Sequence, residues 1–343
     1  MTRATPARGH GTSASRGGVI LEYHRTSDVA PDPHGISVSP QRFAEHMEVI
    51  SRRYAPTTLV GMSEALRGGR IAPNSVAVTF DDGYADNLLN AKPILESQGI
   101  PATFFVTVGY VEDQREFWWD ELERCLLEAT SLPARLELET GGRPYRRNLG
   151  DSRGVPSKTD ASYWRWDLSV KKPPTPRHRA YRELHAKLRS LPPSRRERLL
   201  DELKSQAGLR REPAREEYRP LTPAELRELD RGDLAEVGAH GVTHSVLARL
   251  PLEDQGEEIE GGKARLERLL GRRVNLFSYP FGGKRDFTAK TARIVREAGF
   301  EAVCTSRQGK VVRTTDPLLL PRVFIYDWKG EEFERQMERF FGP

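Results

Sequence analysis

Apolar positions along the chain recur with two periods and predict alternating strands and helices. Short, mostly apolar runs rich in branched or aromatic residues indicate buried strands. These runs lie at residues 19–24, 75–80, 102–107, 235–239, 275–279, 302–305 and 320–326. Helical spacing of apolar residues predicts one helix that begins at Ser39-Pro40 and another that ends near Gln98-Gly99. The same spacing predicts two further helices, over residues 257–270 and 288–298. Such alternation is typical of a mainly parallel sheet in an α/β fold.

Two adjacent carboxylates follow the second of these strands directly. Residues 75–80 run into Asp81, Asp82 and Gly83, so the carboxylates are expected at the C-terminal end of a buried strand. In α/β barrels, catalytic residues gather at that end of the strands. Side-by-side carboxylates suit two tasks, since one can hold a metal ion while the other moves a proton. The alternative is an ordinary Asp-Gly turn.

Two histidines four residues apart follow the short strand at 235–239. At this spacing the imidazoles of His240 and His244 can project from one face of a single helical turn. Two histidines and one carboxylate with open coordination positions are typical of a hydrolytic zinc or cobalt site. The alternative is a pair of unrelated polar residues at a loop. It competes poorly, because the chain has only eight histidines.

These clusters and a third segment resemble a known family, the NodB-type polysaccharide deacetylases (carbohydrate esterase family 4). Residues 79–83, Thr-Phe-Asp-Asp-Gly, match the family's first motif. Residues 240–244, His-Gly-Val-Thr-His, match the spacing of its H-(S/T)-x-x-H motif, with glycine where serine or threonine is usual. Residues 277–282 are similar to a divergent third motif, and the resemblance covers roughly 18–110 and 230–328. It implies a distorted (β/α) barrel that removes acetyl groups from N-acetylated sugars with a divalent metal.

The resemblance implies roles for individual residues. Asp82, His240 and His244 would bind one divalent metal, expected to be zinc, with cobalt and nickel as alternatives. Asp81 would be the general base that takes a proton from the attacking water. The backbone N–H of Phe281 would donate to the oxyanion that forms during the reaction, and an ordinary turn there is the alternative.

The chain departs from the family pattern at two positions. Ser278 stands where the family usually has an arginine that orients the base. We expect Arg322, a lone charge in an apolar strand, to replace it, and an arginine that extends to the surface is the alternative. No histidine follows His244, although many members carry their general acid there. We therefore expect His24 to protonate the leaving amine, as in members that begin with a Tyr-His strand and resemble circular permutations; a structural histidine is the alternative.

Residues from about 111 to 220 interrupt the alternation of strands and helices. They are expected to form a largely helical insertion in a single barrel domain over residues 18–343. The insertion holds four of the five tryptophans, which can stack on a sugar ring or pack the insertion onto the barrel. The residues expected to contact the substrate are Tyr84, Trp118, Trp119, Tyr279 and Pro280. The histidines expected at the surface or in packing are His10, His34, His46, His178 and His185.

Composition bears on where the protein is located and on which partners it binds. Residues 1–17 are polar and basic and are expected to form a disordered leader without a signal-peptide core. No apolar run approaches the roughly 20 residues needed to cross a membrane, and two cysteines far apart do not indicate a disulfide framework. We therefore expect a cytoplasmic protein, with the membrane surface as an alternative site. The net charge of +5 comes from runs of mixed sign, which indicates a solvated, salt-bridged surface. Attraction to an anionic partner, such as a sugar pyrophosphate or a membrane surface with lipid-linked glycans, is the alternative, and no nucleic-acid partner is expected.

The expected function is that of a metal-dependent deacetylase. It would hydrolyse the acetamide of an N-acetylated amino sugar to a free amine and acetate. A cytoplasmic location favours a polysaccharide precursor, a lipid-linked or nucleotide-linked sugar, or an amino-sugar metabolite over mature wall polymer. The alternatives are a carbohydrate O-deacetylase and a glycan-binding module without catalysis.

Overall fold

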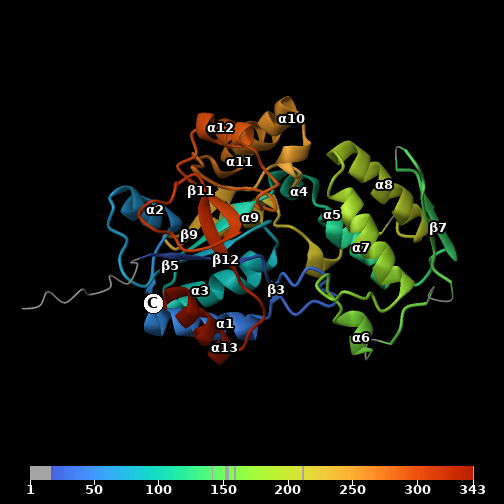
Figure 1. Cartoon of the computed structure of the whole chain (residues 1–343), viewed down its shortest axis with the longest axis horizontal. Coiled ribbons are helices and arrows are strands. Elements are labelled where there is room, and N and C mark those ends of the chain that lie inside the picture. Colours follow the sequence, from blue (N-terminus) through green and yellow to red (C-terminus); the bar gives the residue numbers. More distant parts are fainter. Residues whose placement is uncertain (1–16, 141, 151–153, 158–159, 211, 343) are drawn as a thin grey trace, which may run out of the picture.

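The structure, a computed structural model, describes residues 17–140, 142–150, 154–157, 160–210 and 212–342. Its centre is a closed ring of parallel strands in the order β1-β12-β11-β10-β9-β6-β5, in which β5 pairs back onto β1. Figure 1 shows helices around these central strands. The strands of the ring are β1 (Val19–Tyr23), β5 (Ser75–Phe80), β6 (Ala102–Val106), β9 (Ala235–Ala239), β10 (Leu276–Ser278), β11 (Ala302–Gln308) and β12 (Leu320–Phe324). The predicted (β/α) barrel is confirmed.

Three short strands lie beside the ring. β4 (Ala55–Pro56) extends the sheet next to β5, and β2 (Arg25–Thr26) pairs in parallel with β3 (Ser37–Val38). The chain between β2 and β3 carries His34.

Side-chain alternation along β1 decides which residues face the barrel interior. Val19, Leu21 and Tyr23 pack in the core between the ring and the outer helices. Ile20 belongs instead to an inner cluster that also takes residues from β5, β6, β10, β11 and β12. Because side chains alternate with a period of two, Glu22 lies on the same face as Ile20, closer to the C-terminal end of the barrel.

Helices surround the ring. They are α1 (Pro40–Arg53), α2 (Leu59–Arg67), α3 (Lys92–Gln98), α4 (Val108–Asp113), α9 (Pro223–Leu229), α10 (Leu252–Gly256), α11 (Gly262–Leu270), α12 (Ala289–Glu297) and α13 (Gly330–Phe341). π-helical turns at Asn87–Ala91 and Glu257–Gly261 precede α3 and α11, and 3₁₀ turns lie at Glu216–Tyr218 and Leu247–Arg249. α1 begins as predicted, because the Ser39 side chain accepts a hydrogen bond from the Arg42 N–H and Pro40 occupies the first turn.

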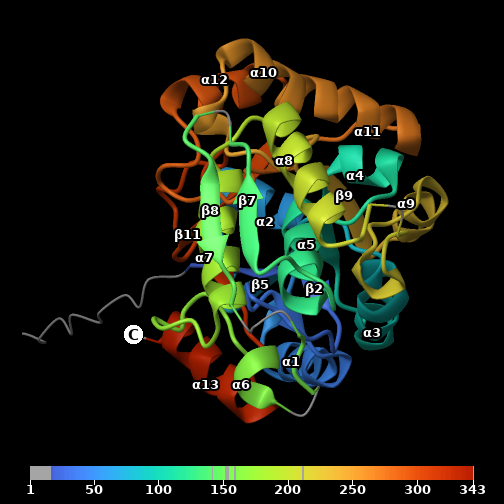
Figure 2. The same ribbon diagram turned by 90° about the vertical axis from the view of Figure 1, so that its right-hand side faces the viewer.

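The segment between α4 and α9 forms a second layer beside the barrel (Figures 1 and 2). Its elements are α5 (Trp118–Glu123), a π-helical turn (Arg124–Glu128), β7 (Arg135–Leu138), β8 (Tyr145–Asn148), α6 (Ala161–Trp164), α7 (Pro176–Leu188) and α8 (Pro193–Gln206). It has a hydrophobic core of its own. The segment is largely helical, as predicted, but the antiparallel hairpin β7–β8 was not predicted.

Two predictions about the chain's ends and domains stay predictions. The disordered leader at 1–17 lies, apart from Gly17, outside the described residues, and the boundaries of the insertion at about 111 and 220 are not tested. Among the described helices, none combines the length and apolar composition that a bilayer crossing requires.

Candidate metal centre

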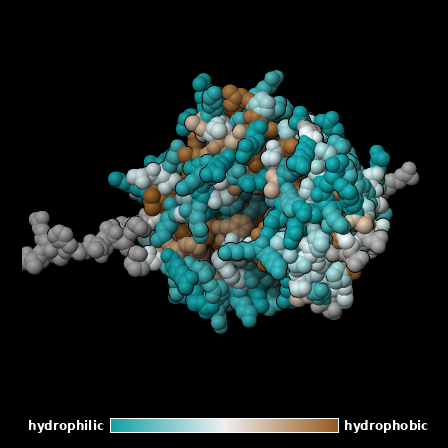
Figure 3. Space-filling model, turned by 45° about the vertical axis from the view of Figure 1, so that its right-hand side comes forward, coloured by the Kyte–Doolittle hydropathy of each residue, from teal (hydrophilic) through white to brown (hydrophobic). Residues whose placement is uncertain are grey.

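The C-terminal mouth of the barrel holds a pocket that gathers the predicted carboxylates and histidines. Its volume is about 240 Å³. The pocket is lined by Glu22, His24, His34, Ile36, Asp81, Asp82, Trp119, His185, His240, His244, Phe281, Ser306 and Phe324. α5 and α7 contribute Trp119 and His185, so the pocket lies where the barrel meets the neighbouring segment. The surface is hollowed near the middle of the face in Figure 3.

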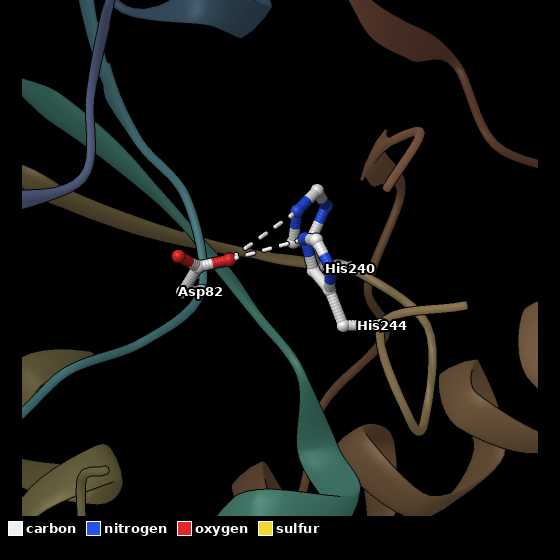
Figure 4. A group of neighbouring side chains, drawn as sticks. All are labelled: Asp82, His240 and His244. Atoms are coloured by element: carbon white, nitrogen blue, oxygen red, sulfur yellow. Dashed lines mark ion pairs between the residues drawn. The ribbon is translucent and has the colours of Figure 1, made fainter. Parts of the chain in front are cut away.

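Three side chains from two strand ends converge in this pocket (Figure 4). Asp82 follows β5, and His240 and His244 follow β9. His244 Nε2 lies 3.3 Å and His240 Nε2 lies 3.7 Å from Asp82 Oδ1. Ligands of a tetrahedral zinc ion at about 2.0–2.1 Å are themselves about 3.3–3.4 Å apart. The spacing of these three side chains is therefore close to that of a zinc ligand set.

Hydrogen bonding and charge also fit a cation at this position. His240 Nδ1 lies 2.8 Å from the Ser278 carbonyl oxygen, which can only accept, so Nδ1 carries the proton and Nε2 presents its lone pair. Asp82 is 2% exposed, and its Oδ1 makes no hydrogen bond within the described residues. Burial, and then the neighbouring Asp81, raise the pKa of Asp82 well above its ordinary value. A divalent cation would supply the positive charge that this buried carboxylate lacks.

Asp81 has a different environment from its neighbour. Arg322 donates two hydrogen bonds to it, from Nη1 to Oδ1 at 2.7 Å and from Nη2 to Oδ2 at 2.6 Å. Ser278 Oγ donates to Asp81 Oδ2 at 3.2 Å and accepts from Arg322 Nη2 at 2.9 Å. Burial raises the pKa of Asp81, but Arg322 and then His240 outweigh it and hold this pKa well below its ordinary value. The small serine leaves room for Arg322, which is 1% exposed, so the surface alternative for this arginine is wrong.

His24 and Phe281 both line the pocket. His24 Nδ1 is buried and makes no hydrogen bond within the described part of the chain. Burial lowers the pKa of His24 to about 4, although Asp81 opposes the shift. The Phe281 ring centroid lies 4.6 Å from that of His244. The Phe281 backbone has φ of +62°, a conformation that a bulky residue rarely adopts.

Unusual backbone geometry concentrates at this site. Among the described residues, five other than glycine have positive φ, and Asp82, His244 and Phe281 are three of them. Such conformations cost roughly 1–3 kcal/mol each and gather at functional sites. Pocket residues therefore hold three of the five strained positions.

The helical turn predicted for the two histidines is wrong, since residues 240–244 form a loop. Gly241 has φ of +77°, which breaks any helix there. Glu258 Oε2 accepts hydrogen bonds from the backbone N–H groups of Val242 at 2.9 Å and Thr243 at 3.1 Å. This carboxylate holds the loop, and the loop brings both imidazoles together.

Four of the five residues expected to contact substrate are buried and lie outside the pocket lining, so the structure does not bring them to the candidate site. Tyr84 is fully buried, and its hydroxyl donates to Asp120 Oδ2 at 2.7 Å. Trp118 is 1% exposed and stacks on His185 of α7, so it packs within the segment's own core. Tyr279 is fully buried against Phe287, and Pro280 is also buried.

Trp119 is the remaining residue of that group, and it does line the pocket. Its indole N–H donates to the Tyr84 hydroxyl at 2.8 Å, and its ring lies 4.7 Å from His244. Tyr84 therefore orients Trp119.

Sequence reasoning missed further residues of the pocket. They are Glu22, His34, Ile36, His185, Ser306 and Phe324. His34 and His185 were expected at the surface or in packing, but their rings lie 4.6 Å apart in the pocket wall. Glu22 carried a readable signal, a single charge in an otherwise apolar strand just before Tyr23-His24.

Comparisons with known proteins agree with this site and fold. Residues 69–131 and 205–303 match the family described as polysaccharide deacetylase. Over 111 residues the chain is 31% identical to the poly-beta-1,6-N-acetyl-D-glucosamine N-deacetylase of Escherichia coli (strain K12), a stretch that is 31% of this chain and 16% of that relative. The chain thus spans only about a sixth of the curated relative.

Solved structures share the fold over most of the chain. The Streptococcus pyogenes deacetylase PplD in complex with acetate gives a TM-score of 0.58 at 16% identity, covering 94% of this chain and 99% of that one. IcaB from Ammonifex degensii gives 0.56 at 19% identity, covering 96% and 98%. The matched segments contain both aspartates and both histidines, and over these segments the chain is similar to the polysaccharide deacetylase family. The solved structures show that the chain shares the fold of these deacetylases. The circular permutation stays a prediction.

Proposed function

We propose that this chain is a metal-dependent N-deacetylase that hydrolyses the acetamide of an N-acetylated amino sugar to a free amine and acetate. One observation carries the proposal: a pocket places Asp82, His240 and His244 beside an aspartate that Arg322 keeps ionised. The similarity to the polysaccharide deacetylase family and the N-deacetylase activity in the name of the E. coli relative support it.

Asp82, His240 and His244 would hold the cation, with zinc as the proposed metal and cobalt or nickel as alternatives. When bound, a divalent cation would polarise the acetamide carbonyl and acidify the attacking water. Asp81 accepts the proton of that water, and its two bonds from Arg322 hold its carboxylate ionised and in a fixed orientation.

His24 and Phe281 complete the proposed chemistry. Since the pKa of His24 is about 4, its imidazole is neutral before the reaction. One ring nitrogen of His24 lies within 4.8 Å of one oxygen of Asp81, so it can carry the proton from Asp81 to the leaving nitrogen. The backbone N–H of Phe281 would donate to the developing oxyanion.

The substrate class is proposed from the pocket and the relatives. Trp119 is an aromatic side chain of the pocket wall whose orientation the Tyr84 hydroxyl fixes, and an aromatic side chain there suits contact with a sugar ring. The proposed substrates are an N-acetylated glycan or its lipid-linked or nucleotide-linked precursor. An O-deacetylase is the second candidate, because the same groups can hydrolyse an ester.

Acetate release by the zinc-loaded protein tests the proposal. The panel comprises N-acetylglucosamine, its β-1,6-linked oligomers, a nucleotide-linked form, a lipid-linked form and an O-acetylated sugar. We expect release from at least one N-acetylated member and its loss on chelation. Release from the O-acetylated sugar alone would establish the esterase instead. If no member releases acetate while zinc is bound, the proposed hydrolase is wrong and the binding-module alternative takes its place.

A further inference from the structure

Glu22 is a pocket residue to which the proposed mechanism gives no task. Its side chain is 2% exposed. Its Oε1 accepts hydrogen bonds from Ser306 Oγ at 2.6 Å and from Arg322 Nη2 at 3.2 Å. Its Oε2 is buried and has no hydrogen-bond partner within the described residues. Glu22 lines the pocket. Hydrogen bonds hold its Oε1 in place, whereas its Oε2 has no donor among the described residues.

An unpaired buried carboxylate oxygen is costly, so a donor from a ligand is the natural partner of Oε2. The other pocket side chains with buried unpaired atoms, Asp82, His24 and His244, already have proposed tasks. Burial raises the pKa of Glu22 to about 7, which agrees with a carboxyl group that lacks full solvation or pairing.

A second cation is a poor partner for Glu22. One oxygen of Glu22, a ring nitrogen of His24 and one oxygen of Asp81 lie within 4.8 Å of one another, which is a donor set that metals use. However, Arg322 Nη2 already lies 3.2 Å from Glu22 and 2.6 Å from Asp81. A divalent ion there would meet the guanidinium charge at close range. A neutral hydrogen-bond donor avoids that repulsion.

We propose that Glu22 is a specificity-determining residue whose Oε2 accepts a hydrogen bond from a hydroxyl of the substrate sugar. The inference rests on the proposed function. Because an oxygen of Glu22 lies within 4.8 Å of the proposed base Asp81, the donor lies close to the reacting acetamide. The hydroxyl is therefore one on a ring carbon next to the carbon that bears the acetamide. The substrate class is an acetamido sugar that is unsubstituted at this hydroxyl.

The first test compares substrates on the wild-type zinc enzyme and needs no variant. The substrates are the best N-acetylated sugar of the panel and its analogues that lack, or carry a methyl ether at, each hydroxyl next to the acetamide. At about pH 9, where a carboxyl group with a pKa of about 7 is ionised, loss of one hydroxyl should lower kcat/KM by about 10- to 100-fold, as expected for a hydrogen bond to a charged group. If none of these changes lowers kcat/KM, the inference is wrong.

The second test assigns the effect to Glu22. In Glu22→Gln, the amide oxygen can still accept from Ser306 and Arg322, whereas the NH₂ group presents a donor to the pocket where the wild type has an acceptor. The ratio of kcat/KM between the hydroxyl substrate and its deoxy analogue should fall toward one. Glu22→Asp keeps the acceptor and should retain part of the ratio. Equal zinc content and unfolding temperature of the variants control for folding, and an unchanged ratio in Glu22→Gln would overturn the inference.

A binding measurement separates this inference from the proposed function. If the wild type releases no acetate from any substrate, calorimetry of zinc-loaded protein with glucosamine and its 3-deoxy and 1-deoxy analogues still tests Glu22. The wild type should bind glucosamine about 10-fold more tightly than one analogue, and Glu22→Gln should bind both alike. Equal affinities in the wild type would overturn the inference on their own.

Discussion

At the scale of single residues, two neighbouring carboxylates occupy opposite electrostatic environments. Arg322 pairs with Asp81 and lowers its pKa, whereas burial raises the pKa of Asp82, for which the described residues provide no comparable cation. Groups whose pKa values are pushed apart are suited to different tasks in one reaction. The pair is therefore suited to one proton acceptor and one metal ligand.

Replacement of Arg322 should show how much this side chain contributes to the unfolding free energy by neutralising the buried carboxylates. In Arg322→Met, both Asp81 and Glu22 lose their buried cation, so we expect a loss of about 3–5 kcal/mol in unfolding free energy. Urea unfolding of metal-free wild type and variant measures it.

Arg322→Lys is the matched control for this prediction. Lysine keeps the positive charge but cannot make the bidentate hydrogen bonds of Arg322 to Asp81. Arg322→Lys should therefore lose less unfolding free energy than Arg322→Met. Equal unfolding free energies of the wild type and Arg322→Met would show that the ion pairs of Arg322 with Asp81 and Glu22 contribute nothing to stability.

How far the sequence predicts the site depends on how local each signal is. Asp81, Asp82, His240 and His244 lie in short motifs at strand ends, and those motifs are visible in the sequence. His34 and His185 lie in segments 151 positions apart that come together only through packing, and neither has a local motif. A lone histidine on a helix such as α7 looks the same whether it faces a pocket or a core.

At the scale of elements, the loop after β9 shows how the sequence can predict that His240 and His244 lie together and still predict the wrong backbone conformation for the segment between them. The four-residue spacing fits a helical turn, yet Gly241 and the Glu258 carboxylate fix a loop instead. Glu258 lies fourteen or more residues further along the chain, beyond the reach of a spacing argument.

Gly241→Ala should therefore damage the metal centre. An added Cβ would lie 2.9 Å from Glu258 Oε2, and the positive φ alone costs about 1–2 kcal/mol. Gly299 has the same φ of +77° but nothing within 4 Å of an added Cβ, so Gly299→Ala is the matched control. Zinc affinity, measured by competition with a chromophoric chelator, should fall in Gly241→Ala and stay unchanged in Gly299→Ala. Equal affinities would contradict this account of the loop.

The packing of α1 against the C-terminal part of the chain gives a pH-dependent prediction. His46 Nε2 donates to the Trp328 carbonyl oxygen at 2.8 Å, its Nδ1 lies 3.2 Å from the Tyr23 hydroxyl, and its ring stacks on Phe333. Burial lowers the pKa of His46 to about 4 from 6.5. A lowered histidine pKa means that the stability it contributes is present above about pH 6.5 and is lost as the pH falls toward 4.

Comparison with His46→Gln isolates this effect from other titrating groups. Between pH 7.5 and 5, the wild type should lose about 2 kcal/mol more unfolding free energy than the variant. Urea unfolding at the two pH values provides the measurement. Parallel losses in both proteins would mean that His46 titrates alike in the folded and unfolded states.

At the scale of the whole molecule, the pocket lies between two hydrophobic cores. One core fills the space between ring and outer helices, and the other lies within the segment that carries α5, α7 and α8. The sequence predicted the ring, because strand and helix periods are strong local signals. It did not predict which face of the segment meets the mouth, because that depends on contacts such as the hydrogen bond from Trp119 to Tyr84.

Metal binding should stabilise the whole fold by mass action. At a free zinc concentration about 100 times the Kd, the gain is about 2.7 kcal/mol. Calorimetric unfolding with zinc and with a chelator should show a higher temperature for the zinc-loaded wild type. His240→Ala removes a proposed ligand, so its unfolding temperature should be the same in both conditions. A zinc-dependent shift of equal size in that variant would place the metal elsewhere.

The measurement that tests the central claim most directly compares the two aspartates in parallel. Zinc content and acetate release are determined for the wild type, Asp81→Asn and Asp82→Asn, with the best substrate of the panel. We predict that Asp81→Asn keeps about one zinc per chain and loses at least about 100-fold in kcat, whereas Asp82→Asn loses the zinc and the activity together. Full activity in Asp81→Asn, or full zinc occupancy with normal turnover in Asp82→Asn, would contradict the roles assigned to this pair.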